Sequence, residues 1–304
     1  MTAAPGAPHR APPCAPPDFA PRPPRLALPA LSCDCHAHIL GPASRHAYSS
    51  DRIYTPPDCL LADYRAMLAA LGVERAVLVQ PSVYATDNTV MLQALRESGP
   101  AFRGVAVVDW EIGDAALESM HAAGVRGVRV NMVDVKNADA KNAGGVLPLD
   151  LLTALARRIA PLGWHMELLI HVDEFASLDH DLADFPVDVV FGHLGYMRTA
   201  LGLAAPGFQA LRRLLKAGRS WVKLTGPYRI STTGLPYADV TPFAAALIQA
   251  APERVLWGSD WPHVMLTGAM PNDGDIADLL ATWIPDDHQR RKVLVENPAR
   301  LYGF

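Results

Sequence analysis

Short apolar runs alternate with amphipathic segments along most of this chain, and this alternation limits the fold more than any other feature. Eight runs are continuously apolar, which is typical of parallel strands covered on both faces. These runs span residues 31–37, 75–80, 102–108, 125–131, 164–172, 187–192, 221–224 and 255–258. The expected helices span residues 60–71, 89–97, 115–123, 150–162, 178–185, 206–217, 241–251, 275–283 and 287–296. Eight strand–helix units predict an α/β fold, a single closed (β/α)8 barrel of the TIM type.

An open, doubly wound sheet is the alternative arrangement of such units. That fold should carry a glycine fingerprint such as G-x-G-x-x-G after its first strand. The equivalent place here holds Asp34-Cys35-His36-Ala37-His38, which favours the barrel.

The residues before the first strand differ in composition from the rest. Ten of the 27 prolines fall within residues 1–30, and this segment has no apolar stretch of the kind found in a signal peptide. We therefore expect a proline-rich N-terminal arm over residues 1–30, one barrel domain over residues 31–304 and a cytoplasmic location.

Charge and cysteine content exclude several functional classes. Among the 304 residues, 27 basic and 31 acidic side chains give a formal net charge of −4, with no basic stripe for nucleic acid and no polybasic run for a membrane surface. No uncharged apolar run reaches the roughly 18 residues of a transmembrane helix. The four cysteines lie in the first fifth of the chain, which is not the pattern of a disulfide framework.

Polar side chains follow the predicted strands at their C-terminal ends, where barrel enzymes carry their active sites. His36 and His38 lie two residues apart on the first strand, so their side chains are expected on one face. Later strands and the loops after them contribute Ser82, Arg129, Asn131, Glu167, His171, His193, Lys223, Arg229 and Asp260. Burying four histidines and an aspartate together has a desolvation cost that an ordinary core avoids. The cluster therefore predicts a catalytic site.

Several of these residues form motifs of a known family. The segments Asp34-x-His36-x-His38, His171, Gly192-His193 and Gly258-Ser259-Asp260-Trp261-Pro262 resemble the amidohydrolase superfamily, from residue 32 to the end of the chain. The chain is most similar to the branch of lactone hydrolases that includes 2-pyrone-4,6-dicarboxylate lactonase. The resemblance implies that the catalytic residues are His36, His38, His193 and Asp260, and that substrate carboxylates are bound by Tyr54, Ser82, Arg129 and Arg229.

The chemistry of these side chains agrees with lactone hydrolysis. Asp260 is the best candidate for a base that takes a proton from water and returns it to the leaving oxygen. The histidines can stabilise the developing oxyanion, and the two arginines can each bind a carboxylate through paired hydrogen bonds.

Two positions bear on the substrate and on a metal. The lactonase branch carries a second arginine after the strand-four arginine, whereas this chain offers Lys136, a point charge without the planar fork. This chain also has a strand-five histidine, as metal-dependent amidohydrolases do. The set His36, His38, His171 and Asp260 could hold one Zn²⁺ or Mn²⁺ ion. Metal-assisted and metal-free catalysis are both left open.

The leading hypothesis is a hydrolase of the carboxylic ester bond in a small carboxylated lactone, of the 2-pyrone-4,6-dicarboxylate, muconolactone or sugar-acid type, in aromatic or sugar-acid breakdown. The alternative is a metal-dependent non-oxidative decarboxylase of an aromatic or muconate acid, which shares the strand-one histidine pair and the last aspartate. A third interpretation is a barrel that binds a small acid without catalysis. In each case we expect a small carboxylated partner, and neither nucleic acid nor membrane.

Overall fold

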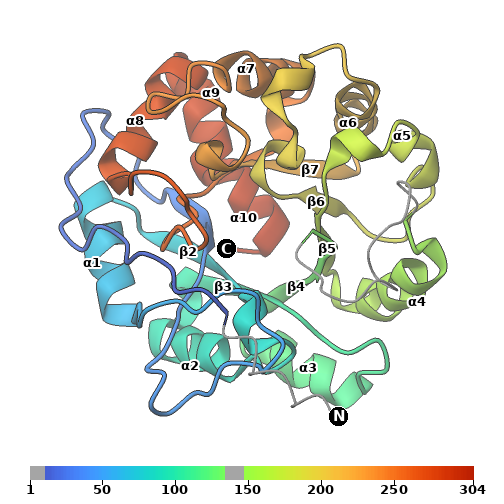
Figure 1. Cartoon of the computed structure of the whole chain (residues 1–304). Helices are drawn as coiled ribbons and strands as arrows, with labels where there is room; N and C mark the ends of the chain where they lie inside the picture. Colours follow the sequence, from blue (N-terminus) through green and yellow to red (C-terminus); the bar gives the residue numbers. More distant parts are fainter. Residues whose placement is uncertain (1–10, 134–146) are drawn as a thin grey trace, which may run out of the picture.

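The computed structural model describes residues 11–133 and 147–304. Eight parallel strands form one sheet, in which each strand pairs with the next along the sequence (Figure 1). The strands are β1 (Cys33–Ala37), β2 (Arg75–Val79), β3 (Phe102–Ala106), β4 (Val125–Asn131), β5 (His165–Leu169), β6 (Val189–Phe191), β7 (Ser220–Leu224) and β8 (Val255–Trp257). The predicted (β/α)8 barrel of the TIM type is confirmed.

The barrel closes where β1 meets the end of β8. A parallel bridge joins Ala37 to Trp261. The His38 amide donates to the Trp261 carbonyl over 2.8 Å, and the Asp260 amide donates to the His36 carbonyl over 2.9 Å. This seam places the strand-one histidines beside the strand-eight aspartate.

Helices follow the strands and cover the outside of the barrel (Figure 1). The α-helices are α1 (Leu61–Leu71), α2 (Thr89–Ser98), α3 (Asp114–Ala122), α4 (Leu149–Ile159), α5 (Leu178–Asp181), α6 (Pro206–Ala217), α7 (Thr241–Ala250), α8 (Asp273–Trp283), α9 (Asp287–Arg291) and α10 (Asn297–Tyr302). Short 3₁₀ turns are η1 (Ser82–Tyr84), η2 (Gly99–Ala101), η3 (Ala160–Leu162), η4 (Val172–Glu174), η5 (His193–Tyr196), η6 (Thr199–Leu201), η7 (Pro227–Arg229) and η8 (Pro252–Arg254), and η9 (Lys292–Glu296) is a π-helical segment. No helix within the described ranges is both long and apolar enough to cross a membrane.

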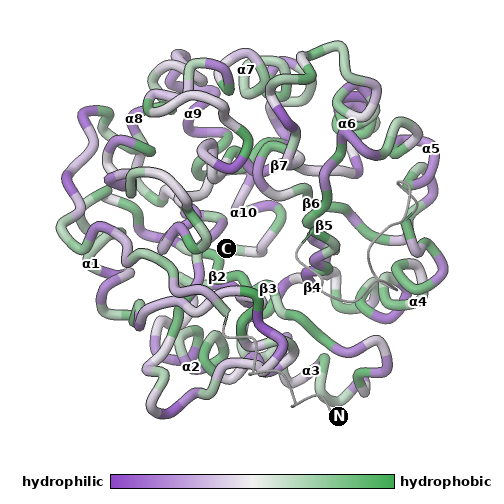
Figure 2. Tube along the Cα trace, viewed as in Figure 1, coloured by the Kyte–Doolittle hydropathy of each residue, from purple (hydrophilic) through white to green (hydrophobic). Residues whose placement is uncertain are grey.

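Apolar side chains fill two layers, and the strands carry much of the hydrophobic colour in Figure 2. The larger cluster packs the outer faces of the strands against the helices. A smaller cluster takes alternate strand residues and lies inside the barrel. It consists of Cys33, Cys35, Val77, Val79, Val105, Val190, Trp221 and Leu256, with Tyr302 of α10. The interior of the barrel is therefore packed with side chains, as in other barrels of this type.

The described part of the expected arm, residues 11–30, contains no helix and lies against the barrel. The Cys14 amide donates to the Thr55 carbonyl over 2.8 Å. Arg25 Nε donates to Asp278 of α8 over 2.8 Å, although the Arg25 side chain is largely exposed, so this ion pair adds little stability.

Candidate active site

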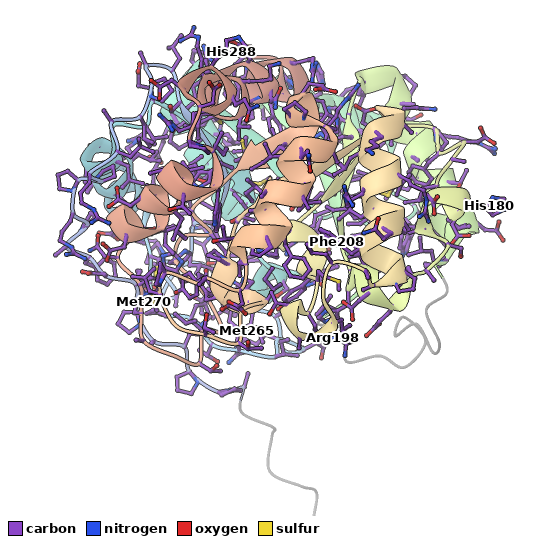
Figure 3. The ribbon with its side chains drawn as sticks, turned by 90° about the horizontal axis from the view of Figure 1, so that it is seen from above. His180, Arg198, Phe208, Met265, Met270 and His288 are labelled. Atoms are coloured by element: carbon purple, nitrogen blue, oxygen red, sulfur yellow. The ribbon has the colours of Figure 1, made fainter. Side chains whose placement is uncertain are left out.

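The loops that follow β6 and β8 lie at one end of the molecule. Figure 3 places Met265 and Met270, from the loop after β8, at the same end as Arg198, from the loop after β6, with His288 of α9 at the opposite end. A cavity of about 30 Å³ lies among the strand ends there, and it is lined by His38, Tyr54, Ser82, Arg129, Asn131, Leu169, His193, Tyr196, Arg229, Val264 and Met265. The cavity brings the four residues expected to bind substrate together with two of the expected catalytic histidines.

His36, His193 and Asp260 form a buried cluster. Each offers one ligand atom, and these atoms all lie within 4.8 Å of one another. His36 Nε2 is 3.7 Å from Asp260 Oδ1, and His193 Nδ1 is 4.0 Å from Asp260 Oδ2, which is too far for a hydrogen bond. Within the described ranges, His36 Nε2, His193 Nδ1 and Asp260 Oδ1 are buried without a hydrogen-bond partner. These atoms can therefore face a bound ion, water or substrate atom.

This donor set fits a divalent cation. Two imidazole nitrogens and one carboxylate oxygen are zinc ligand types, and catalytic sites leave a further position for water or substrate. Burial lowers the pKa of His36 and lowers that of His193 further. Both rings are therefore neutral near pH 7, as a metal ligand must be.

His171 does not belong to this cluster. Its Nδ1 is 3.0 Å from the Tyr196 carbonyl oxygen, and its ring stacks on the Tyr196 ring with centroids 4.5 Å apart. Of the four residues expected to hold a metal, the structure brings together His36 and Asp260, and it adds His193 as the third member.

His38 also stands outside the cluster. Its Nδ1 is 2.7 Å from the Val79 carbonyl oxygen, which can only accept, so Nδ1 carries the hydrogen and Nε2 is left as an acceptor. Burial, with the charges of His36 and Arg129, lowers the pKa of His38 to about 3. The neutral ring lines the cavity with an acceptor nitrogen, which suits a water molecule better than an oxyanion.

An ion pair inside the barrel supports His36. Lys223 Nζ is 2.5 Å from Glu167 Oε2, and Glu167 Oε1 is 3.4 Å from His36 Nδ1. Burial alone would raise the pKa of Glu167, but the charge of Lys223 and the contact with His36 hold it well below its usual value. Lys223 Nζ is also 3.5 Å from His36 Nδ1, so an acceptor and a donor of the ion pair both face this ring nitrogen. The sequence pattern placed Glu167 and Lys223 at strand positions but did not indicate this role.

The two oxygens of Asp260 have different surroundings. Oδ2 accepts from Arg229 Nε and from the Tyr228 hydroxyl, each over 2.6 Å, whereas Oδ1 is without a partner in the described parts of the chain. Burial by itself would raise the pKa of Asp260, but the Arg229 charge holds it well below its ordinary value. Asp260 is therefore an ionised carboxylate with one oxygen available, as a general base requires.

The two arginines differ in what they offer an anion. Arg229 donates to Asp260 and, through Nη2, to a backbone carbonyl over 3.1 Å. Arg129 makes one long hydrogen bond of 3.4 Å to the Gln80 carbonyl, and its buried Nε has no partner in the described structure. Arg129 is thus better placed to bind a substrate carboxylate. Lys136, the expected substitute for a second arginine, lies outside the described residues.

Backbone strain gathers around the cavity. His193, Leu194 and Tyr196 have φ angles of 49°, 54° and 52°, and Asp260 has 68°. Residues other than glycine in this left-handed region cost roughly 1–3 kcal/mol each and persist where the surroundings impose them, often at active sites. No residue pattern in the sequence indicated these conformations.

Asp34 connects the two strands of the seam and is a further residue whose role the sequence pattern did not indicate. It accepts from Ser259 Oγ over 2.5 Å, from the Ser259 amide over 2.9 Å and from the Tyr64 hydroxyl over 3.0 Å. The position of Asp34 in the Asp34-x-His36 motif was the one sequence feature that could have indicated a role for it. These hydrogen bonds fix the residues that precede Asp260 relative to His36.

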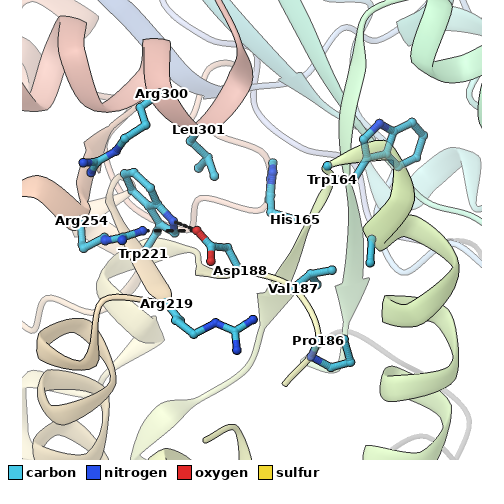
Figure 4. A pocket seen from close by; sticks show the side chains of 12 residues that line it. Trp164, His165, Pro186, Val187, Asp188, Arg219, Trp221, Arg254, Arg300 and Leu301 are labelled. Atoms are coloured by element: carbon cyan, nitrogen blue, oxygen red, sulfur yellow. Dashed lines mark hydrogen bonds and ion pairs between the residues drawn. The ribbon is translucent and has the colours of Figure 1, made fainter. Parts of the chain in front are cut away.

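A second cavity, of about 370 Å³, lies at the N-terminal ends of β5, β6 and β7. Figure 4 shows Arg254 and Trp221 on the same side of Asp188, joined to its carboxylate by dashed lines. Trp221 Nε1 donates to Asp188 over 2.7 Å, and Arg254 Nη1 is 3.3 Å from the same carboxylate. The guanidinium carbons of Arg254 and Arg300 each lie 4.7 Å from the centre of the Trp221 ring. These groups pair with one another at the end of the barrel opposite the usual catalytic face, which indicates a structural role.

Comparison with known proteins agrees with this arrangement. The family profile described as Amidohydrolase matches residues 33–304. A 4-sulfomuconolactone hydrolase of Rhizobium radiobacter is 37% identical over 294 residues, covering 96% of each chain, and a 2-pyrone-4,6-dicarboxylate hydrolase of Comamonas testosteroni is 36% identical over 291 residues, covering 93% of each. An apo crystal structure from Agrobacterium tumefaciens aligns with a TM-score of 0.79 and 29% identity, over 92% of this chain and 98% of that one. The resemblance noted in the motifs is confirmed, and the chain belongs to the amidohydrolase family.

Proposed function

We propose that this protein is a hydrolase that opens a small carboxylated lactone. The proposal is carried by two groups at one end of the barrel, an ionised Asp260 and a buried Arg129. Among residues 11–133 and 147–304, Asp260 Oδ1 and Arg129 Nε have no hydrogen-bond partner. The first can activate water and the second can hold an anionic substituent. The names of two relatives, a sulfomuconolactone hydrolase and a pyrone dicarboxylate hydrolase, support a lactone that bears anionic groups.

The proposed reaction uses Asp260 twice. Asp260 Oδ1 accepts a proton from a water molecule as the water oxygen attacks the lactone carbonyl carbon. The tetrahedral intermediate then breaks its bond to the ring oxygen, and Asp260 returns the proton to that oxygen. The product is a hydroxy acid, and the carboxylate is ready for another cycle.

Binding of the substrate is assigned to the cavity wall. A hydrogen bond to a charged group contributes roughly 1.5–3 kcal/mol, so Arg129 can anchor one carboxylate, with Tyr54 and Ser82 in the same wall. Arg229 faces the same cavity but already donates to Asp260, and we assign it mainly to holding the base.

His36, His193 and Asp260 would hold one divalent ion, Zn²⁺ or Mn²⁺. Such an ion, when bound, polarises a carbonyl and acidifies water. Metal content of the purified protein and of His193→Asn tests the assignment, because a resident ion should be lost in the variant. Equal metal content in both proteins would exclude His193 as a ligand.

A lactone screen tests the proposed reaction. Wild-type protein is incubated with carboxylated lactones, with and without added Zn²⁺ or Mn²⁺, and NMR identifies ring-opened products. Asp260→Asn should lower kcat by roughly 10²- to 10⁴-fold, the usual contribution of a general base, while the exposed Asp184→Asn serves as the matched control. Lactones that stay intact under both conditions contradict the proposal. Carbon dioxide released from an aromatic or muconate acid would support a decarboxylase instead.

A further inference from the structure

Tyr228 links the catalytic base to a second polar pair. Its hydroxyl oxygen is 2.6 Å from Asp260 Oδ2 and 2.9 Å from His263 Nδ1. On the other side of the imidazole, His263 Nε2 is 3.1 Å from Asp273 Oδ1. His263 is 1% exposed and Asp273 is fully buried, so bulk water does not compete for these contacts.

The three residues come from separate segments. Tyr228 lies in η7, His263 follows β8, and Asp273 is the first residue of α8. The line of contacts therefore connects the start of α8 to the base through the loop after β7.

The hydrogens along this line can be counted. Ionised Asp260 needs a donor at the Oδ2–Tyr228 contact, and the Tyr228 hydroxyl supplies it. The Tyr228 oxygen, having given its hydrogen to Asp260, can meet His263 Nδ1 only as an acceptor. His263 Nδ1 therefore carries the hydrogen of that contact.

We propose that Tyr228, His263 and Asp273 are positioning residues for Asp260, with the His263 ring held by hydrogen bonds between the phenol and the second carboxyl group. The inference rests on the proposed hydrolysis, in which Asp260 Oδ1 takes the proton from water. With Tyr228 and Arg229 both bound to Oδ2, the carboxylate cannot rotate, and Oδ1 stays turned toward His36.

A double-mutant cycle tests the positioning role. Tyr228→Phe and Asp273→Asn should each lower kcat by roughly 10- to 100-fold, as for other partners that orient a catalytic group, with KM changed by less than about twofold. Because Asp273 acts through Tyr228, the Tyr228→Phe/Asp273→Asn double variant should be no slower than Tyr228→Phe alone. Losses in kcat that multiply, or that appear in KM instead, overturn the proposal.

Tyr237→Phe is the matched control for loss of a hydroxyl. Tyr237 is a buried tyrosine whose ring meets the Tyr228 ring edge-on, with centroids 6.4 Å apart, and it does not contact the base. Its kcat should equal that of the wild type. A Tyr237→Phe loss as large as that of Tyr228→Phe would show that general packing, rather than the hydrogen bond to Asp260, sets the rate.

Nitrogen-15 NMR of histidine-labelled protein tests the hydrogen count without turnover. Resonances that disappear in His263→Gln identify His263, and near neutral pH its Nδ1 should have the shift of a protonated nitrogen in the wild type. An Nδ1 shift typical of an unprotonated ring nitrogen would contradict the proposal. Failure of lactone hydrolysis leaves this measurement valid, and an unprotonated Nδ1 in a protein that still opens lactones overturns the positioning role alone.

Discussion

The ion pair between Lys223 and Glu167 is almost fully removed from solvent, with side-chain exposures of 0% and 1%. Taking two charges out of water costs several kcal/mol per ion, and an apolar pair of similar volume is often no less stable. Stability alone therefore does not explain this pair. The contact of the pair with His36 does explain it, because Glu167 Oε1 and Lys223 Nζ lie 3.4 Å and 3.5 Å from Nδ1 of that imidazole and hold the ring beside Asp260.

Breaking this pair should destabilise the protein strongly. Glu167→Gln leaves the Lys223 charge buried without compensation, and we expect a loss of about 3–5 kcal/mol in the free energy of unfolding, measured by urea denaturation. The Glu167→Gln/Lys223→Met double variant should regain most of that loss. A single variant as stable as the wild type would show that Lys223 finds another partner.

Arg129 should control substrate affinity more than turnover. Arg129→Met removes the buried cation that lines the cavity, and we expect KM to rise by roughly 10- to 100-fold, equivalent to one charge-assisted hydrogen bond. Arg126→Met is the control, because Arg126 lies at the start of the same strand and donates to backbone carbonyls there. A fall in kcat at unchanged KM would instead place Arg129 in the chemical step.

The sequence predicted which residues belong to the candidate site more readily than it predicted their hydrogen-bond partners. Positions at strand ends indicated both His171 and His193, but only tertiary contacts show that His193 joins the cluster and that His171 does not. The left-handed backbone of η5 begins at His193, while the carbonyl and ring of Tyr196 engage His171. The Glu167–Lys223 contact joins two strands that are not neighbours in the sheet, so it depends on the closure of the barrel.

Among the elements, the loop after β7 approaches the site most closely through Gly226. Its φ of +57° is left-handed, and a Cβ there would lie 2.7 Å from Asp260 Oδ2 and 2.9 Å from His193 Nδ1. A side chain at this position would therefore displace both residues. The lack of a side chain at Gly226 therefore leaves room for Asp260 and His193 to approach each other against the loop backbone.

Gly226→Ala should damage activity more than stability. Left-handed alanine costs roughly 1–2 kcal/mol, whereas a shift of about 1 Å in a catalytic group can lower the rate 100-fold. Gly218 is also left-handed, with a φ of +84°, and the nearest atom to a Cβ there, Arg254 Nη2, would lie at an ordinary contact distance of 3.7 Å. Gly218→Ala should therefore lose stability without losing kcat. Similar kinetics for the two variants would contradict the role of the close contact.

The order of strands and helices was predictable because continuous apolar runs and helical spacing are local properties. The residues at which the helices begin and end were harder to predict. The helix expected over residues 178–185 ends at Asp181, and Pro186 disfavours helical backbone at the preceding residue. The helix expected over residues 287–296 divides into α9 and the π-helical η9, and α10 follows from Asn297. Pro298 cannot donate to a continuing α-helical ladder, so the wider turn precedes it.

At the scale of the whole molecule, buried neutral histidines make stability depend on pH. Burial lowers the pKa of His38 and of His165 to about 3. Between about pH 3 and the unfolded value near 6.5, the unfolded chain binds more protons than the folded one, so stability falls as pH falls through this window and is fully present above it. Asp34 changes stability with pH in the opposite sense. Burial raises the pKa of its carboxyl to about 6, so between the unfolded value near 3.9 and about pH 6 the folded chain binds more protons, and stability falls as pH rises.

His165→Leu isolates one part of this dependence. Between pH 6 and pH 5 the slope of unfolding free energy against pH should become smaller by about 1 kcal/mol per pH unit, because one histidine that charges only on unfolding has been removed. Urea denaturation at several pH values measures the slope, and exposed His288→Leu is the control. An unchanged slope in His165→Leu would mean that this ring is already protonated in the folded protein.

Arg129 and Ser82 line two cavities, the one of about 30 Å³ beside His193 and another of about 390 Å³ that reaches Leu151 of α4. Sites for small molecules usually enclose about 300–1,000 Å³, so the larger cavity has room for the substituents of the proposed lactone, while the smaller one has room only for its reacting end. A bulky side chain in the larger cavity, as in Leu151→Trp, should therefore raise KM in steady-state kinetics. An unaltered KM would exclude this cavity from the binding site.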